Sequence, residues 1–153
     1  MVSFSCKGGR SPNISKEAPT MKTIPETVQK LLGEQSIWYI ATCRDHTPNA
    51  VPVAFKQILP DGRLAVADVF MQVTKANVEA NDKIAVSACD ASTMEGYQVK
   101  GTAEYLSSGP IVDQFKAVVE EATKGGLHAK GVVVITPEVI ISTGVGPDNN
   151  KQL

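Results

Sequence analysis

The feature of this sequence that most restricts its fold is a run of strand-like segments joined by very short links. Between residues 36 and 106, stretches rich in β-branched and aromatic residues alternate with turn signals such as Pro60-Asp61-Gly62. Parallel strands need connections of about a dozen residues or more, whereas antiparallel strands can be joined by a tight turn. The pattern therefore predicts a mainly antiparallel sheet, most simply a small barrel.

Six strands with peripheral helices account for this pattern, so the expected fold class is mainly β. Helices are predicted at 23–33, where Thr23 and Glu26 are spaced as a capping box, at 74–81 with Thr74 as the cap, and at 108–124. The expected strands are 36–43, 50–58, 64–68, 83–89 and 97–106, followed by a last strand that joins 131–135 to 139–142 and bends at Pro137.

The 153 residues are enough for one domain with its own hydrophobic core. Residues 1–20 are rich in Ser, Gly, Pro and Lys and lack apolar periodicity, so we expect a disordered leader, and Met21 could serve as the natural start. Residues 21–145 form the predicted barrel. Residues 146–153 are polar and are expected to form a loose tail.

The composition argues against several classes of function. Lys and Arg number 15 against 16 Asp and Glu, which gives a formal charge of −1, whereas a nucleic-acid binder would carry a clear basic excess. No apolar run approaches the roughly 18 residues of a membrane span. The 3 cysteines are widely spaced and lack a C-x-x-C pair, which is typical of reduced thiols. We therefore expect a cytoplasmic protein with neither a nucleic-acid nor a membrane partner.

The sequence is also short of catalytic side chains. His46 and His128 are its only histidines, and neither has a partner at the spacing of metal ligands. It contains no phosphate-binding G-x-x-x-x-G-K and no dinucleotide-binding G-x-G-x-x-G. Such a chain is either a binding module or an enzyme whose chemistry comes from a cofactor. No catalytic residue and no metal ligand can be named from it.

The predicted strand 50–58 is the first candidate binding segment. Alternation places Val51, Val53 and Phe55 on its core face. Pro52 donates no hydrogen bond to a neighbouring strand, so this stretch lies at an edge or faces something other than a strand. Small side chains beside a Lys could receive a flat ring with an anionic arm; the alternative is a solvated edge strand. The residues on that second face are Pro52, Ala54 and Lys56.

The second candidate is the segment 68–77, where a strand runs through a loop directly into a helix. Free N–H groups and the helix dipole favour phosphate at a helix N-terminus, and Thr74 and Lys75 would add donors. The loop also carries apolar residues that need a contact partner. The alternative is a plain capped surface helix. The apolar loop residues are Val69, Phe70 and Met71.

A third and weaker candidate is the segment bounded by Gly96 and Gly101. Glycines at both ends of a strand segment are typical of bulges or of close approach by a ligand or another backbone. Tyr97 and Lys100, which lie between them, could face such a ligand or could be ordinary neighbours within the sheet.

Taken in order, these segments resemble the FMN-binding split-barrel family, the group related to pyridoxamine 5′-phosphate oxidase. The resemblance extends from about Thr23 to Thr143. It rests on a helix followed by IWYIATC, AVPVAF, the turn PDGRL, the loop and helix MQVTKANVEAN, and the strand GYQVKGTAEYL. It implies a six-stranded antiparallel split β-barrel that pairs as a homodimer, with FMN in the groove between the two copies.

The resemblance also implies which residues hold the flavin. Many family members carry a basic residue just before the phosphate-binding Thr; this chain has none there, so Lys56 or Lys75 would have to supply the charge. The implied contacts are Pro52, Val53 and Ala54 beside the ring, Asp68, Val69, Phe70, Met71, Gln72 and Val73 around the ring and ribityl chain, Thr74 at the phosphate, Asn77 at the end of the motif, and Tyr97 and Lys100 at the dimer groove.

The expected function is therefore that of a small FMN protein that transfers hydride or electrons between unidentified small molecules. Pyridoxamine 5′-phosphate oxidase itself is not expected, because that enzyme holds its substrate with Arg and His residues near its C-terminus and no Arg follows Arg63 here. The alternatives are a non-catalytic flavin carrier or electron-transfer module, and a protein that binds a deazaflavin or haem on the same barrel.

Overall fold

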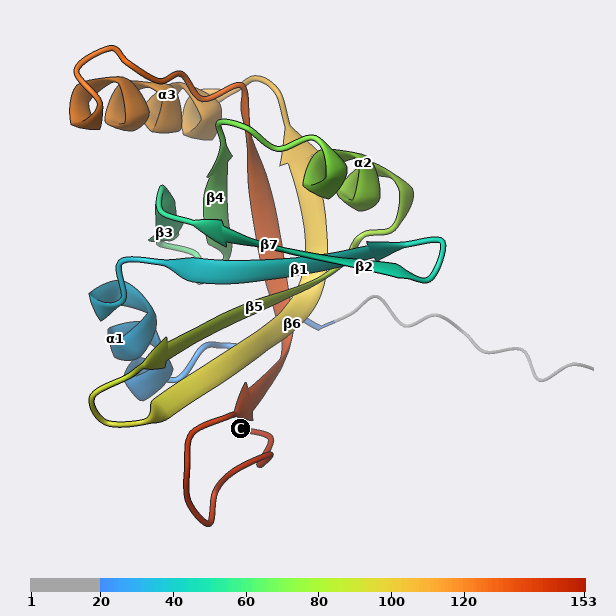
Figure 1. Cartoon of the computed structure of the whole chain (residues 1–153), viewed down its shortest axis with the longest axis vertical. Helices are drawn as coiled ribbons and strands as arrows, with labels where there is room; N and C mark the ends of the chain where they lie inside the picture. The colour runs from blue at the N-terminus through green and yellow to red at the C-terminus, as the bar shows by residue number, and fades with distance from the viewer. Residues whose placement is uncertain (1–19) are drawn as a thin grey trace, which may run out of the picture.

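The computed structural model describes residues 20–153, so the expected leader lies outside the described residues except for Thr20. These residues form one seven-stranded sheet in the order β2-β1-β5-β6-β7-β4-β3, with every neighbouring pair antiparallel (Figure 1). The elements are α1 (Glu26–Glu34), β1 (Trp38–Arg44), β2 (Thr47–Val53), β3 (Lys56–Ile58), β4 (Leu64–Asp68), α2 (Val73–Ala80), β5 (Lys83–Asp90), β6 (Glu95–Leu106), α3 (Pro110–Ala122) and β7 (Gly131–Ser142).

The sheet curls so that its two edge strands, which follow one another in the sequence, come close together in space. β2 and β3 lie at opposite ends of the strand order, yet only Ala54 and Phe55 separate them. The Phe55 carbonyl accepts a hydrogen bond of 2.8 Å from the N–H of Ala67 in β4, which directs the chain onto the far edge. A link of this length spans roughly 10 Å at most. The edges must therefore approach each other. The mainly β, antiparallel fold predicted from the sequence is confirmed, and the curled sheet is consistent with the split-barrel type.

The predicted number of six strands is wrong. Within residues 20–153 there are seven strands, because the segment expected as one strand at 50–58 breaks at Ala54 and Phe55, where the chain leaves one edge of the sheet for the other. In contrast, β7 passes through Pro137 without interruption. A register shift between Lys100 and Gly101 in β6 accommodates the bend, and the Thr136 carbonyl fills the space where a side chain on Gly101 would lie.

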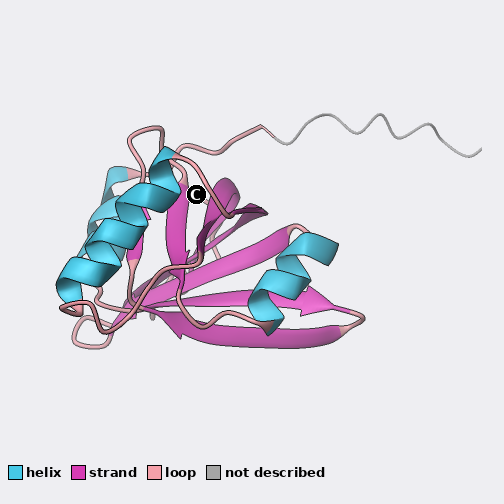
Figure 2. Ribbon diagram, turned by 90° about the horizontal axis from the view of Figure 1, so that it is seen from above, coloured by secondary structure: helices cyan, strands magenta, loops and turns pink. Residues whose placement is uncertain are grey.

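β7 organises the hydrophobic core because both of its faces are buried. Val133 and Ile135 point into the barrel, where they pack in one cluster with Trp38 of β1. Val132 and Val134 point the other way, into a second cluster formed with α3. The helices thus lie at the flanks of the sheet (Figure 2). Within residues 20–153, no helix is long and apolar enough to cross a membrane.

The three described helices all start at other residues than predicted, α3 at Pro110 where 108 was expected, and the starts of α1 and α2 also change the predicted caps. α1 begins at Glu26 with Pro25, which has no side-chain donor or acceptor, as its N-cap, and the neighbouring Ile24 is buried in the core. The capping box predicted from Thr23 is therefore not formed. α2 begins one residue earlier than expected, with Gln72 as N-cap. Thr74 is thus inside the first turn, and its hydroxyl has another partner, described below.

The prediction of a loose tail is also wrong. The last residues fold back along β7, where the N–H of Ser142 donates to the Lys151 carbonyl and the N–H of Leu153 donates to the Ile140 carbonyl, both at 2.9 Å. The Leu153 side chain packs against the main core. β4 pairs with β7 only as far as Ile135, so the tail covers the strand edge that β4 leaves open.

Candidate functional site

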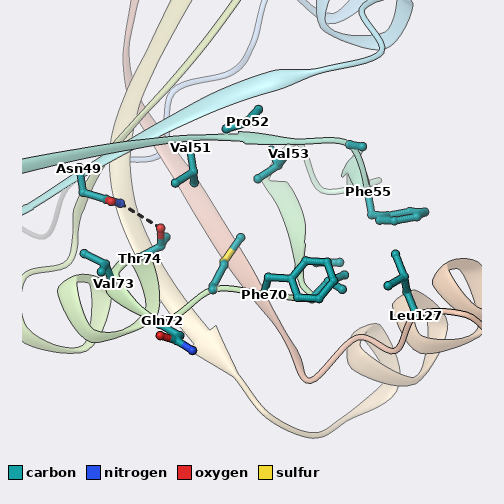
Figure 3. A pocket seen from close by; sticks show the side chains of 14 residues that line it. Asn49, Val51, Pro52, Val53, Phe55, Phe70, Gln72, Val73, Thr74 and Leu127 are labelled. Carbon is teal, nitrogen blue, oxygen red and sulfur yellow. Dashed lines mark hydrogen bonds between the residues drawn. The ribbon is translucent and has the colours of Figure 1, made fainter.

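A cavity of about 450 Å³ lies between the edge strand β2, the loop at residues 69–72 and the start of α2 (Figure 3). Its volume is within the range of roughly 300–1,000 Å³ that is typical of small-molecule sites. The lining residues are Asn49, Val51, Pro52, Val53, Ala54, Phe55, Ala67, Val69, Phe70, Met71, Gln72, Val73, Thr74 and Leu127.

β2 provides an apolar wall. Among the described strands it pairs with β1 alone, as expected of an edge strand that contains Pro52. Figure 3 shows Val51 and Val53 pointing towards the 69–72 loop, with the Pro52 ring on the other side of the strand. The face that opens onto the cavity is therefore that of Val51 and Val53. The alternation pattern instead predicts the ring on the opposite face, and Lys56 of that face does not line the cavity.

The start of α2 provides a polar end. The first hydrogen bond of this helix runs from the N–H of Ala76 to the Gln72 carbonyl, at 3.1 Å. The N–H groups of Val73, Thr74 and Lys75 consequently have no acceptor within the helix. Gln72, Val73 and Thr74 all line the cavity, so this end offers backbone donors and the positive end of the helix dipole to a ligand.

A buried polar network fixes the hydroxyl at this end. The Asn49 side-chain amide donates to Thr74 Oγ1 at 3.0 Å and to Thr42 Oγ1 at 3.2 Å, and the Asn77 amide donates to Thr42 Oγ1 at 3.1 Å. Thr74 is only 2% exposed. Because its oxygen accepts from Asn49, the hydroxyl proton remains available to a ligand. Asn77 therefore supports the site without lining it.

Asp68 acts on the cavity through the loop. Its carboxylate is 1% exposed and accepts hydrogen bonds from the Met71 N–H at 2.8 Å and from the Tyr105 hydroxyl at 2.7 Å. The Lys130 ammonium lies 3.6 Å from the same carboxylate. Asp68 thus positions the loop that forms part of the cavity wall, but it does not itself line the cavity.

The lysines expected to face the ligand are occupied elsewhere. Lys56 Nζ lies 4.8 Å from the centroid of the buried Trp38 ring, and burial lowers the pKa of this lysine. Lys75 Nζ lies 4.5 Å from the centroid of the Tyr105 ring and pairs with Glu79 at 3.9 Å. Neither lysine lines the cavity of the single chain, so the expectation that one of them supplies positive charge to a ligand stays a prediction. Across residues 20–153, no charged side chain lines the cavity.

The third candidate segment lies apart from this cavity. Tyr97 borders a smaller hollow of about 170 Å³ between β6 and the C-terminal tail, and Lys100 is exposed on β6. Neither residue lines the main cavity of its own chain, and their predicted place at a dimer groove stays a prediction. Within the described part of the chain, no cluster of His, Cys, Asp and Glu could hold a metal ion, and Cys43 and Cys89 are free thiols.

Most of the residues that line the cavity were predictable from the sequence, but some were not. Alternation along β2 could have added Asn49, which shares a face with Val51 and Val53. Leu127 follows α3 and reaches the cavity only through the fold, so no local pattern indicates it. The predicted residues that the structure brings together are Pro52, Val53, Ala54, Val69, Phe70, Met71, Gln72, Val73 and Thr74. The residues missed are Asn49, Val51, Phe55, Ala67 and Leu127.

Comparison with known proteins relates this chain to one family. The sequence profile described as pyridoxamine 5′-phosphate oxidase matches residues 24–144. An uncharacterized protein of Methanocaldococcus jannaschii is 35% identical over 134 residues, which cover 86% of this chain and 87% of that protein.

Solved structures show the same fold at lower identity. HupZ of Group A Streptococcus superposes with a TM-score of 0.70 at 24% identity, covering 82% of this chain and 98% of that one. An FMN-binding protein of Syntrophomonas wolfei gives 0.68 at 16% identity, with 79% and 86% covered. A structure named F420 reductase gives 0.60 at 20% identity, with 76% and 98% covered.

Proposed function

This chain belongs to the pyridoxamine 5′-phosphate oxidase family, and we propose that it is a small FMN-dependent oxidoreductase that works as a homodimer. The observation that carries the proposal is that one cavity joins an apolar wall on β2 to the free backbone N–H groups of α2. FMN has a matching division into a flat ring and a phosphate.

The residues at the polar end fit a phosphate. The N–H groups of Val73, Thr74 and Lys75 together with the Thr74 hydroxyl would donate to its oxygens, and the helix dipole would favour its charge. Since no cation of the described chain lines the cavity, binding at this end would rest on hydrogen bonds and the dipole. We therefore expect FMN to be held with only moderate salt dependence.

The residues at the apolar end fit a flat ring. Val51 and Val53 would contact one side of the ring, and Met71 would close the space from the 69–72 loop. Three apolar side chains from different loops meet at the far end of the cavity, where they would exclude water (Figure 3). They are Phe55, Phe70 and Leu127.

Bound FMN would supply the hydride or electron transfer for which the cavity lining itself provides no group. The chain would bind, orient and shield the cofactor. Its free thiols Cys43 and Cys89 fit a reducing, cytoplasmic compartment. We do not expect pyridoxamine phosphate to be the substrate, because neither Arg44 nor Arg63 lines the cavity, where an arginine could bind its phosphate.

Pairing of two copies is supported by exposed apolar residues beside the cavity. Phe70 and Val73 are 76% and 57% exposed, although both line the cavity wall. Large apolar side chains at such exposure favour a protein contact. A second copy placed over them would bury these side chains and close the cavity from solvent.

The absorption spectrum of the freshly purified full chain, followed by extraction and mass measurement of any bound compound, tests the proposal. The expected result is the spectrum of oxidised FMN, or uptake of added FMN by a colourless preparation. A deazaflavin spectrum would favour the second candidate, for which the similarity to a structure named F420 reductase is the supporting observation. A haem spectrum, or a protein that never takes up FMN, would contradict the proposal.

A non-catalytic flavin carrier would share these binding residues, and turnover separates it from an oxidoreductase. The FMN-loaded protein is mixed with NADH or NADPH and common acceptors under steady-state conditions. Rapid reduction with continued turnover would support the oxidoreductase. Stable FMN binding without turnover for any donor and acceptor pair would support the carrier.

A further inference from the structure

Tyr105 of β6 influences the cavity without lining it. Its hydroxyl donates a hydrogen bond of 2.7 Å to one carboxylate oxygen of Asp68, which is the last residue of β4 and is 1% exposed. The other carboxylate oxygen accepts the N–H of Met71 at 2.8 Å. Met71 lies in the 69–72 loop and lines the cavity. A continuous chain of two hydrogen bonds thus joins β6 to the cavity wall.

The surrounding residues are arranged to keep this chain of hydrogen bonds intact. Gly131 lacks a side chain where the Tyr105 hydroxyl passes, and a Cβ there would collide with that hydroxyl. The Lys75 ammonium of α2 covers the Tyr105 ring, and the Lys130 ammonium lies 3.6 Å from Asp68. Burial and the bond to Asp68 raise the pKa of Tyr105, so its hydroxyl remains a donor beyond the pH at which a free tyrosine ionises.

We propose that Tyr105 is a positioning residue for the cavity, which holds the 69–72 loop in its ligand-binding conformation through the carboxylate of Asp68. Without the Tyr105 hydroxyl, the buried Asp68 carboxylate would lose one of its hydrogen-bond donors. Its position would then be less fixed, and so would the position of the Met71 N–H that it binds. The part of this inference that concerns cofactor affinity rests on the proposed function; the part that concerns the loop does not.

Phe70 provides a direct reporter of the loop. It lies between Asp68 and Met71, its side chain is 76% exposed, and chymotrypsin cleaves after such residues once the backbone can enter the protease. Cleavage after Phe70 would yield fragments of known mass. The rate of this cleavage therefore measures how often the loop leaves its bound conformation.

The experiment compares Tyr105→Phe with Tyr97→Phe in the full chain. Both variants remove one hydroxyl from β6, but Tyr97 lies eight residues away, about 26 Å along the strand, beside the other hollow. Each variant is treated with chymotrypsin under native conditions and titrated with FMN, and its global stability is measured in urea. Lys130→Gln is a milder third variant, because it removes only the ion pair between an exposed ammonium and the same Asp68 carboxylate.

For Tyr105→Phe we expect cleavage after Phe70 and the FMN dissociation constant each to rise about tenfold, the effect of losing a hydrogen bond to a charged group. For Lys130→Gln we expect both quantities to rise about twofold, as for an exposed ion pair, and for Tyr97→Phe we expect no change in the rate of cleavage after Phe70. Equal cleavage in Tyr105→Phe and Tyr97→Phe at equal global stability would overturn the inference. If the wild type binds no FMN, the proposed function fails, while the cleavage rates still decide the role of Tyr105.

Discussion

The side-chain amide of Asn49 in β2 donates a hydrogen bond of 3.0 Å to the hydroxyl of Thr74 in the first turn of α2. This bond joins the two walls of the cavity, the edge strand and the helix start, across 25 residues of sequence. It also determines which atom of Thr74 is free to face a ligand, because the oxygen is already engaged as an acceptor.

Replacing Asn49 by Leu should therefore weaken both the fold and the site. The change removes the donor to Thr74 and to Thr42, and we expect a loss of about 1–2 kcal/mol in the free energy of unfolding. The FMN dissociation constant should rise about tenfold, since the Thr74 hydroxyl is no longer oriented. Urea unfolding and an FMN titration measure the two effects.

Asn81→Ala is the matched control for this variant. Asn81 follows the other end of α2, where its amide donates to the Cys43 carbonyl at 2.9 Å. Its loss should lower stability by a similar amount of about 1 kcal/mol and leave FMN affinity unchanged. An equal effect of both variants on affinity would mean that the Asn49–Thr74 bond has no special role in binding.

Thr74→Val should distinguish the contribution of the phosphate to FMN binding from that of the ring. The valine keeps the shape of the side chain but removes the hydroxyl at the polar end of the cavity. We expect FMN to bind about tenfold more weakly, whereas riboflavin, which lacks the phosphate, should bind as it does to the wild type. Parallel fluorescence titrations with the two ligands measure this ratio.

Thr102→Val, a change of the same kind at a half-buried position of β6, should leave the ratio as it is in the wild type. If Thr74→Val weakens FMN and riboflavin by the same factor, the hydroxyl does not act at the phosphate and the orientation proposed for the cofactor is incorrect.

The hydrogen bond of Tyr105 predicts a dependence of stability on alkaline pH. Burial and the nearby Asp68 raise the pKa of this tyrosine above its ordinary value of 10.0, so above that pH the folded protein retains a proton that the unfolded chain releases. The stability that Tyr105 contributes is therefore complete below pH 10.0 and is lost as the pH rises further.

The wild type should thus lose more stability than Tyr105→Phe when urea unfolding is repeated between about pH 9 and about pH 11.5. Burial lowers the pKa of Lys56 below 10.5, which changes stability in the opposite direction, but this contribution is common to both proteins and cancels. Parallel pH profiles for the two proteins would show that Tyr105 is not strongly bonded in the folded state.

The folded C-terminal tail predicts that Leu153 contributes to stability. Its side chain packs against the main core, and its N–H binds β7. Leu153→Ala should cost about 1 kcal/mol, below the range for a fully buried leucine because the residue is only half-buried. Val145→Ala alters the same tail at a side chain that is 79% exposed and should change the unfolding free energy by less than about 0.5 kcal/mol. Equal midpoints in urea for the two variants would indicate that the tail is not docked.

The sequence predicted the parts of this fold that depend on local chemistry. The hairpin between β1 and β2 is an example: the expected strands leave residues 44–49 for the link, and the structure has a tighter turn there, with Asp45 and His46 at positive φ. The loop and helix start at 69–74 likewise follow from the switch between strand and helix patterns. These features are encoded within a few residues, so they could be recognised without the rest of the chain.

The features that the sequence did not predict depend on long-range contacts. Lys56 and Lys75 were candidates for phosphate binding because of their position along the chain, yet each lies over an aromatic ring from another element. Leu127 enters the cavity from the loop after α3. The break of the strand at Ala54 and Phe55 follows from the closure of the sheet, which no local pattern encodes.

The most direct test of the central claim, that FMN lies between β2 and α2, is a titration of the wild type and Val51→Phe with FMN. The Val51 side chain points into the cavity, where a phenyl ring would occupy the space proposed for the flavin ring, and Val118→Phe places the same ring on an exposed face of α3. We predict that the wild type and Val118→Phe bind one FMN per chain and that Val51→Phe binds it at least about tenfold more weakly. Equal FMN affinity in all three proteins, or no binding by the wild type, would contradict the account.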